Sequence, residues 1–337
     1  MRPGDGTALD RAVLERVLDA SGVDPARLSS YAQAAEGTFN SVHILRLTEG
    51  PDLVLKVAPD PQAPMMSYEH GLTRTEELFY RTAAGRVPVP DVLHADFGRG
   101  VIDRDFLLMT RCPGESWHAR HPGIGPGERI RLRAELGRLA AALHRITGPG
   151  FGYPHLGLAA DWRTAFLAMI DAVLADARAF AAALPVPADR VAELVHGQAD
   201  LLDEVGTPVL VHFDLWPGNI LVDTTDRGPV ISGLVDGERC FWGDPLAEMV
   251  SVALFGDVED DPAFLRGYRG AGGTVVLDAR TRRRLALYRC YLYLIMLVEA
   301  VPRRAGGPEH EHVARLVRRE LTASLDALAG IGTEDGR

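Results

Sequence analysis

Hydrophobic and polar residues change their spacing twice along the 337 residues of this chain. Residues 7–20 carry apolar side chains at helical spacing and end at Ser21-Gly22, which predicts a first helix. Between Ser30 and Arg111 the apolar residues fall in short runs separated by turn residues, a pattern typical of β-strands. One helical pattern, from about Tyr68 to Ala84, interrupts these runs. We therefore predict a small α+β lobe with five strands, whose sequences are YAQAAE, SVHILRL, DLVLKVA, DVLHADF and DRDFLLMTR.

The pattern becomes mostly helical after Cys112-Pro113-Gly114. Apolar residues recur at three-to-four spacing near 127–146, 161–183, 188–204, 245–255, 280–301 and 309–329. Three short runs in the middle of this half favour strands instead: Val209–Val211, Ile220–Val222 and Val230–Val235. The predicted fold class is thus α+β with two lobes. Residues 1–111 form a five-stranded antiparallel lobe that includes the first helix, residues 112–331 form a mainly helical lobe, and 332–337 form a disordered tail.

Composition narrows the class of protein. The net charge of −10 and the pI near 5.6 argue against a nucleic-acid-binding protein, which normally presents a basic face, and they suit a cationic small substrate. The three cysteines are widely scattered, so we expect neither disulfides nor a zinc site, and a reducing compartment fits best. The longest apolar run, Tyr291–Val298, is too short to span a bilayer. We therefore expect a cytoplasmic protein without a membrane partner.

One basic residue stands out from the others. Lys56 is the only lysine, and the other 35 of the 36 basic side chains are arginine. It lies within the apolar run LVLKVAP. A bias toward arginine accounts for the other 35 positions but not for this one. An ordinary reading is a lysine that extends its stem along an edge strand. The alternative is a compact ammonium kept to bind phosphate oxygens, where the wider guanidinium does not fit.

The densest chemical motif is VLVHFDLWPGNILVD, residues 209–223. It places His212, Asp214 and Asn219 at the spacing H-x-D-x-x-x-x-N in a loop between two short strands. A third strand then ends in Asp236. Phosphoryl transfer needs such a set, because one carboxylate accepts the proton of the incoming hydroxyl while a second carboxylate and an amide oxygen hold Mg²⁺ on the nucleotide. The spacing therefore predicts a phosphotransferase site.

These residues resemble the aminoglycoside phosphotransferase and choline kinase family, small-molecule kinases with a protein-kinase-like bilobal fold. The resemblance extends from about Ser30 to about Leu328. It is carried by EGTFNS, LVLKVAP, the VPVP turn, FLLMTRCPGES, HFDLWPGNILVD and VDGERCFWGDP. The middle loop is highly specific, whereas the glycine segment alone is a weak signal.

The resemblance implies a role for each matching position. Asp214 is expected to act as catalytic base, with His212 bracing the loop, and Asn219 and Asp236 are expected to bind Mg²⁺. Lys56 is expected to bind the α and β phosphates of ATP or GTP, with Glu76 as its partner and Glu77 as the alternative. The remaining nucleotide-binding positions are Gly37, Thr38, Asn40 and Ser41 over the phosphates, through backbone N–H groups, and Thr110 and Cys112 at the purine.

Departures from the protein-kinase pattern restrict the activity. Phe213 replaces the arginine that reads an activation-loop phosphate, and the metal aspartate is followed by Gly-Glu instead of Phe-Gly. Only GERCFWG separates Asp236 from Asp244, so there is no room for a regulated activation segment. We expect a constitutively active enzyme for small acceptors.

Three acidic features keep two interpretations each. Glu238 either lines the cleft or serves as a structural partner. Asp244 is expected to cap the helix that begins at Pro245, with a catalytic role as the alternative. The acidic run 257–261 is typical of a solvated turn before a helix, and it could instead attract a cationic acceptor.

The sequence thus predicts an ATP- or GTP-dependent O-phosphotransferase that modifies a hydroxyl of a small molecule. An antibiotic, aminoglycoside-like or otherwise, is the favoured acceptor. The alternative is a metabolic kinase for an amino alcohol, a sugar or an amino-acid-like compound. A non-catalytic nucleotide-binding protein is the remaining class, disfavoured because Lys56, Asp214, Asn219 and Asp236 are all present.

Overall fold

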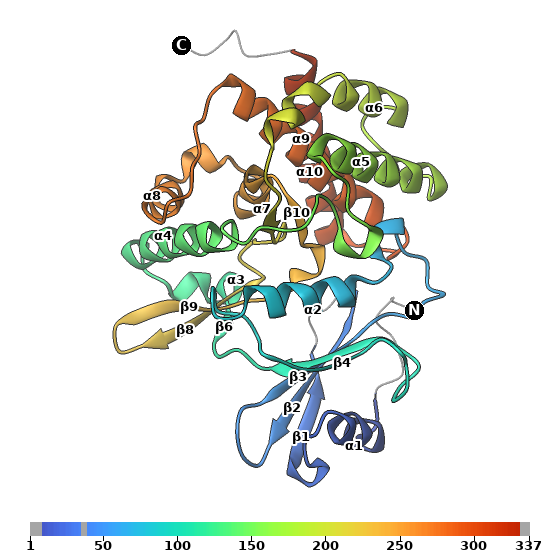
Figure 1. Cartoon of the computed structure of the whole chain (residues 1–337), viewed down its shortest axis with the longest axis vertical. Helices are drawn as coiled ribbons and strands as arrows, with labels where there is room; N and C mark the ends of the chain where they lie inside the picture. The colour runs from blue at the N-terminus through green and yellow to red at the C-terminus, as the bar shows by residue number, and fades with distance from the viewer. Residues whose placement is uncertain (1–8, 35–38, 331–337) are drawn as a thin grey trace.

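The computed structural model describes residues 9–34 and 39–330 and consists of two lobes (Figure 1). The smaller lobe is a five-stranded antiparallel sheet in the order β1-β2-β3-β5-β4. Its strands are β1 (Leu28–Gln33), β2 (Ser41–Leu47), β3 (Leu53–Val57), β4 (Val92–Asp96) and β5 (Phe106–Thr110). The α+β class and the five predicted strands are confirmed.

Two helices cover the two faces of this sheet. Helix α1 (Arg11–Ala20) is capped by Asp10, whose carboxylate accepts the N–H of Val13 at 2.8 Å, and it packs its apolar stripe under one face. Helix α2 (Leu72–Ala83) lies between the opposite face and the larger lobe (Figure 1). Because side chains alternate along a strand, Leu53, Leu55 and Val57 pack with α1. The same alternation turns Lys56 toward α2.

The larger lobe is built around α9 (Ala279–Glu299), which is buried on nearly every side. Helices α5 (Trp162–Ala179), α7 (Glu248–Val252) and α10 (Pro308–Ala329) pack against it. The other helices are α3 (Trp117–Arg120), α4 (Pro126–Leu143), α6 (Ala188–His196) and α8 (Pro262–Gly270). Two small sheets complete the lobe, β6-β8-β9 and β7-β10, with β6 (Glu115–Ser116), β7 (Val209–Val211), β8 (Ile220–Thr225), β9 (Gly228–Leu234) and β10 (Phe241–Gly243).

Several boundaries differ from the sequence-based prediction. The helix expected from Tyr68 is a short 3₁₀ turn, η2 (Ser67–Glu69), followed by α2 from Leu72. The run 188–204 changes from α6 to a 3₁₀ helix at Ala199–Glu204. Helix α8 was expected only as a helix of unstated length after the acidic run 257–261, because its two glycines weaken the helical pattern. The very short β6 and β10 were not predicted, since they exist only through their pairing with β8 and β7. Residues 7 and 8 of the expected first helix and the tail 332–337 lie outside the described residues.

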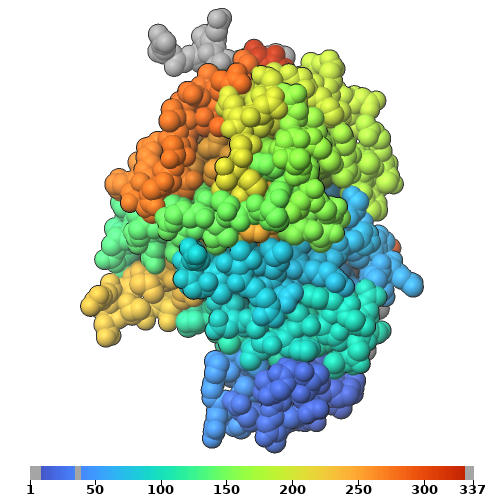
Figure 2. Space-filling model, in the orientation of Figure 1, coloured from blue at the N-terminus to red at the C-terminus, as the bar shows by residue number. Residues whose placement is uncertain are grey.

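The two lobes are in direct contact beyond the covalent connection at Cys112–Gly114. Figure 2 shows the small lobe seated against the larger one. The turn η2 docks onto α5, since the N–H and the hydroxyl of Ser67 both donate to Asp176 Oδ2, at 2.9 and 2.8 Å. The N–H of Leu234 in β9 donates to Pro88 O at 2.8 Å. Across residues 9–34 and 39–330, no helix has the length and apolar character needed to cross a membrane.

Candidate active site

Lys56 contacts two carboxylates, one from each lobe. Its Nζ lies 2.7 Å from Glu76 Oε1 on α2 and also pairs with Asp236, which follows β9. The lysine is only 6% exposed and Glu76 is fully buried. Glu77, the alternative partner, instead pairs with Arg81 on the outer side of α2, at 2.8 Å. The structure thus shows that Glu76 on α2, and not Glu77, is the partner of Lys56 on β3.

Tyr80 links this ion pair to the strand end, and sequence reasoning missed it. Its hydroxyl donates to Glu76 Oε1 at 2.6 Å and accepts the backbone N–H of Asp236 at 3.0 Å. Tyr80 follows Glu76 by four positions, so both side chains share one face of α2. That spacing was the available signal. The tyrosine fixes the distance between the helix and Asp236.

A close packing contact explains the glycine after Asp236. A Cβ on Gly237 would lie 2.2 Å from the ring of Phe79 on α2, a distance that real Cβ atoms essentially never show. The ring also packs edge-on against His212, with centroids 4.9 Å apart. Phe79 therefore occupies the space into which a larger residue at position 237 would have to extend. Asp236 itself has the left-handed backbone conformation, with φ of 59°.

The loop that carries Asp214 is held by a buried carboxylate on α7. Glu248 accepts the successive N–H groups of His212 at 2.8 Å and Phe213 at 3.0 Å. Two residues later, Leu215 N donates to Ser251 Oγ at 3.1 Å. These contacts hold the left-handed conformation of Phe213, with φ of 64°. Sequence reasoning missed Glu248, because it lies 35 residues beyond Phe213 and no local pattern links the two.

His212 braces the loop through both ring nitrogens. Its Nε2 lies 2.9 Å from the carbonyl oxygen of Val235, and its Nδ1 accepts the N–H of Asp214 at 3.2 Å. A carbonyl only accepts and a backbone N–H only donates, so both bonds are satisfied by the tautomer with the proton on Nε2. The imidazole thereby joins the Asp214 loop to the strand that precedes Asp236.

Asn219 lies against Asp214. Its side-chain amide donates to Asp214 Oδ2 at 3.0 Å and to the Asp214 carbonyl at 2.9 Å. The carbonyl of Asn219 accepts Val235 N at 3.0 Å, one residue before Asp236. Because the amide nitrogen faces Asp214, the amide oxygen is the atom of Asn219 available to a cation.

The glycine segment reaches the large lobe through Asn40. Its amide donates to Glu238 Oε2 at 2.6 Å, and the residue is 7% exposed. Glu238 therefore has a structural partner, which is one of its two interpretations, and its lining of the cleft stays a prediction. Ser41 turns its hydroxyl back to His43 Nε2, at 2.8 Å. The predicted phosphate contacts of Gly37 and Thr38 lie outside the described residues.

At the expected purine position, Thr110 ends β5 and its backbone N–H already donates to Asp91 O at 2.9 Å. Its hydroxyl accepts Asp91 N, also at 2.9 Å. Cys112 is half-buried and packs on Gly233 of β9, where an added Cβ would approach its side chain to 2.9 Å. Burial raises the pKa of the Cys112 thiol to about 11. Cys112 is therefore a packing residue at the junction of the lobes, and its contact with a purine remains a prediction.

The pKa values of the acids near Lys56 and Asp214 are shifted in different directions, because their surroundings differ. Burial raises the pKa of Asp214, and the nearby Arg239 and His212 offset only part of that effect. Burial acts in the same direction on Asp236, but Lys56 outweighs it and holds the pKa below its usual range. Burial also raises the pKa of Glu238 to about 7, with Lys56 opposing and Glu76 adding to the shift. Lys56 stays charged, because the three carboxylates around it outweigh its burial and raise its pKa.

A second set of charges beside Asp214 was not predicted. Arg239, 8% exposed, pairs with Glu299 at the end of α9 over 2.6 Å. Arg303 contacts Glu299 at 3.1 Å, pairs with Glu69 of η2, and lies 5.2 Å from the ring centre of Phe39. These pairs connect the end of α9 with the glycine segment and the β3–α2 connection.

The other acidic candidates have structural partners. Asp244 accepts Leu246 N at 2.9 Å, so it caps the turn that leads into α7, and it also accepts the hydroxyl of Tyr288 at 2.6 Å. In the acidic run, Asp257 pairs with Arg289 at 2.7 Å and Glu259 with Arg282 at 2.7 Å. Asp261 caps α8 through Phe264 N at 2.9 Å. The cap formed by Asp261 and the two ion pairs thus identify the acidic run 257–261 as the turn before a helix, α8.

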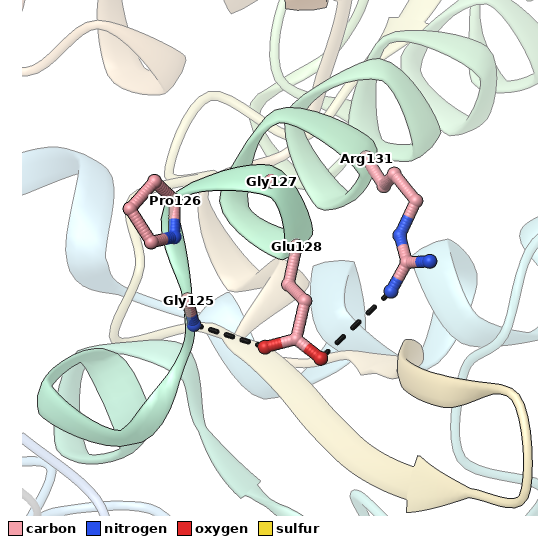
Figure 3. A pocket seen from close by; sticks show the side chains of 5 residues that line it. All are labelled: Gly125, Pro126, Gly127, Glu128 and Arg131. Atoms are coloured by element: carbon pink, nitrogen blue, oxygen red, sulfur yellow. Dashed lines mark hydrogen bonds and ion pairs between the residues drawn. The ribbon is translucent and has the colours of Figure 1, made fainter.

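A surface hollow at the start of α4 contains none of the predicted site residues (Figure 3). It is shallow and is lined by Gly125, Pro126, Gly127, Glu128 and Arg131. Glu128 accepts Gly125 N at 2.9 Å and lies 3.8 Å from Arg131. Its carboxylate thus already satisfies the helix terminus, and this hollow is not part of the candidate site around Lys56.

The residues at the cleft fit a magnesium ion held jointly with a nucleotide. Mg²⁺ prefers oxygen ligands and is usually bound by one or two protein groups together with phosphates. Asn219 offers its amide oxygen, and the Asp236 side chain is 41% exposed toward the cleft. No cluster of three or more His, Cys, Asp or Glu side chains suited to a metal occurs among the described residues.

Comparisons with known proteins agree with this architecture. A curated relative, the subtelomeric hrmA-associated cluster protein of Aspergillus fumigatus, is 24% identical over 135 residues, which are 39% of this chain and 26% of that protein. The chain therefore spans about a quarter of the length of the curated relatives it matches.

Solved structures cover nearly the whole chain. A thermostable mutant of aminoglycoside phosphotransferase APH(4)-Ia, in complex with AMP-PNP and hygromycin B, superposes with a TM-score of 0.62 at 18% identity, over 96% of this chain and 99% of its own. A candidate fructosamine-3-kinase from Thermobifida fusca gives 0.63 at 22% identity, over 96% and 99%. These likenesses confirm the predicted protein-kinase-like bilobal fold.

The family follows from the sequence match. The model of the phosphotransferase enzyme family (APH) matches residues 30–288, which include most of β1, all of β2–β5, the Asp214 loop and the first half of α9. The resemblance inferred from the motifs is confirmed, and the chain belongs to the phosphotransferase enzyme family.

Proposed function

We propose that this protein is an ATP- or GTP-dependent O-phosphotransferase that transfers the γ-phosphoryl group to a hydroxyl of a small molecule. The observation that carries the proposal is the convergence of four side chains from distant segments. Lys56 touches Asp236, and Asn219 touches Asp214. The bond between Val235 N and Asn219 O, 3.0 Å long, ties the two pairs together.

In the proposed mechanism Asp214 accepts the proton of the acceptor hydroxyl. The hydroxyl oxygen forms a bond to the γ-phosphorus while the bond from that phosphorus to the β,γ-bridging oxygen breaks, leaving the nucleoside diphosphate. The raised pKa of Asp214 suits this role, because a general base works best when its pKa approaches the working pH. Asn219 orients the carboxylate through its amide N–H.

The nucleotide would be held from both lobes. Lys56 would exchange its contact with Asp236 for the α and β phosphates, while Glu76 keeps the ammonium in place. Asn219 and Asp236 would hold Mg²⁺, which neutralises charge on the phosphates when it is bound. Asn40 and Glu238 would close the glycine segment over them. A cytoplasmic location, where nucleoside triphosphates are abundant, is part of the proposal.

The favoured acceptor is an antibiotic, and the fold shared with the hygromycin B complex of APH(4)-Ia supports it. The alternative is a metabolic small molecule, and the similar fold of the candidate fructosamine-3-kinase supports that reading. The charges of the acidic run, partnered by arginines, weaken the earlier reason to expect a cationic acceptor.

The test is a panel of antibiotics and metabolic alcohols, incubated with Mg-ATP and Mg-GTP and scored by mass spectrometry for the gain of one phosphoryl group. We expect at least one acceptor to be modified by the wild type and not by Asp214→Asn. Transfer that is equally fast in Asp214→Asn would contradict the mechanism.

A further inference from the structure

A second pocket lies beside α5, away from the Lys56 cleft. Its volume is about 180 Å³, and its inner wall is formed by four largely buried aromatic residues, Tyr68, Phe151, Tyr153 and Tyr291. Ala165 and Met169 of α5 form a side wall, while exposed residues such as Leu156 and Ala168 lie at the opening. Tyr68 comes from the β3–α2 connection, so both lobes build the pocket.

The hydroxyl of Tyr68 is the unusual feature of this pocket. Tyr68 is 2% exposed, and its Oη has no hydrogen-bond partner among the described residues. The ring stacks on Tyr153, with centroids 5.6 Å apart, and the Tyr153 hydroxyl is already bonded to that of Tyr291 at 3.1 Å. A buried hydroxyl without a partner is destabilising, so native structures normally provide one. A ligand atom in the pocket would supply it.

The pocket also adjoins the catalytic loop. The ring of Tyr291 lies 5.6 Å from that of Phe213, the neighbour of Asp214. On the other side, Tyr68 is followed by Glu69, which pairs with Arg303 beside Phe39 of the glycine segment. A molecule in the pocket would therefore be separated from the loop that carries Asp214 by the ring of Tyr291.

The lining defines the chemistry of the occupant. None of the residues that line the pocket is acidic or basic, and the charges that act on Tyr68, those of Arg239, Glu69 and Glu299, are already paired. A charged group would therefore lose its hydration without gaining a free counter-ion. A cavity of about 150 Å³ is known to hold one benzene molecule, so the present volume suits one six-membered ring with a small substituent.

We propose that this pocket binds an uncharged, apolar ring of the acceptor, whose oxygen or nitrogen substituent hydrogen-bonds to Tyr68 Oη. The inference rests on the proposed phosphotransferase function and names the part of the acceptor that gives specificity. The acceptor is then a ring-bearing alcohol, not a polycationic sugar.

Phenol and toluene are suitable probes, measured on the full chain with Mg²⁺ and AMP-PNP by ligand-observed NMR. Both fit the pocket, but only phenol can bond to Tyr68. We expect phenol to bind about 2- to 10-fold more tightly, as one neutral hydrogen bond allows. In Tyr68→Phe this preference should disappear while toluene affinity is kept.

Two variants on α5 locate the binding. Ala168→Trp fills the opening from an exposed position, so the fold should tolerate it, and it should abolish the binding of both probes. Ala175→Trp, exposed on the same helix and not part of the lining, should leave binding unchanged. Equal phenol binding by the wild type and Ala168→Trp would overturn the proposal. Tetramethylammonium binding there more tightly than toluene would also overturn it.

Failure of the pocket assignment can be distinguished from failure of the proposed function. Slow transfer of the γ-phosphoryl group to water, lost in Asp214→Asn, reports the phosphotransferase without any acceptor. Phenol binding with no such transfer would overturn the function and leave the pocket as a binding site. An acceptor from the panel should displace phenol competitively, and an acceptor that is phosphorylated without displacing it would overturn the assignment of the pocket.

Discussion

The side-chain amide of Asn219 donates to the carboxylate of Asp214 over 3.0 Å, and to the Asp214 carbonyl over 2.9 Å. Five positions apart, the two residues are thus locked into one geometry. In the proposed mechanism Asp214 would keep its other oxygen for the acceptor, while Asn219 would keep its amide oxygen for a cation. Proton transfer and metal binding would then fall to neighbouring atoms of one loop.

The first prediction concerns Asp214→Ala. Transfer should fall by about 10²- to 10⁴-fold, the usual contribution of a positioned general base, because the hydroxyl proton then has no acceptor. Nucleotide affinity should stay near that of the wild type, since the residue serves the acceptor. Steady-state kinetics and calorimetric titration of ATP measure the two quantities. Loss of nucleotide binding with turnover retained would refute the assignment.

The second prediction concerns Lys56→Arg, which preserves the charge. The guanidinium is wider than an ammonium and cannot take the same point between Glu76 and Asp236. We expect a large loss of turnover in a protein that remains folded by circular dichroism. Arg46→Lys, at an exposed position of β2, is the matched control and should behave as the wild type. Full activity of Lys56→Arg would exclude the phosphate role.

The third prediction concerns the buried carboxylate of Glu248. In Glu248→Ala the N–H groups of His212 and Phe213 lose their acceptor. Each buried group left unpaired costs about 1–3 kcal/mol, so the free energy of unfolding should fall by about 2–6 kcal/mol. Urea denaturation measures it, with Glu49→Ala, at an exposed turn, as control. A change no larger than that of the control would show that the loop does not depend on α7.

The fourth prediction concerns Gly237→Ala. The added Cβ would overlap the ring of Phe79, so α2 must move away from Asp236. The contacts of Lys56 and Tyr80 with Asp236 should loosen, and nucleotide affinity and turnover should both fall. Gly206→Ala, where no atom lies within 4 Å of the added Cβ, is the control. Nucleotide affinity equal to that of the control would show that the Phe79 contact does not position Asp236.

The fifth prediction concerns pH and Glu238, whose pKa rises in the folded protein from 4.5 to about 7, mainly through burial. Between these two values the folded state holds a proton that the unfolded state has lost. The contribution of Glu238 to the free energy of unfolding is therefore largest below about 4.5 and declines as the pH rises toward 7.

Other acids also titrate in this range, so the effect must be isolated by difference. We compare the free energies of unfolding of the wild type and Glu238→Gln at several pH values. The wild type should lose stability relative to the variant as the pH increases from 4.5 to 7. A difference that is constant with pH would contradict the raised pKa.

Much of the site follows from short-range patterns. The alternation of LVLKVAP places Lys56 on the face of β3 opposite Leu55, and the spacing of His212, Asp214 and Asn219 places them in one loop. The bounds of helix α8 could not be predicted in the same way, since its glycines lower helical propensity and the helix depends on packing against the distant α4.

The sequence by itself determined the main strands and helices, the family, and the candidate residues for the proposed chemistry, because periodicity and motif spacing are properties of neighbouring positions. Only the tertiary structure decided that Glu76 and not Glu77 meets Lys56, that Phe79 requires glycine at 237, and that Glu248 holds the loop of Asp214. The aromatic pocket around Tyr68 was likewise decided by the tertiary structure alone. Each of these contacts joins side chains from separate elements, and their distances depend on how the elements pack, which no local pattern encodes.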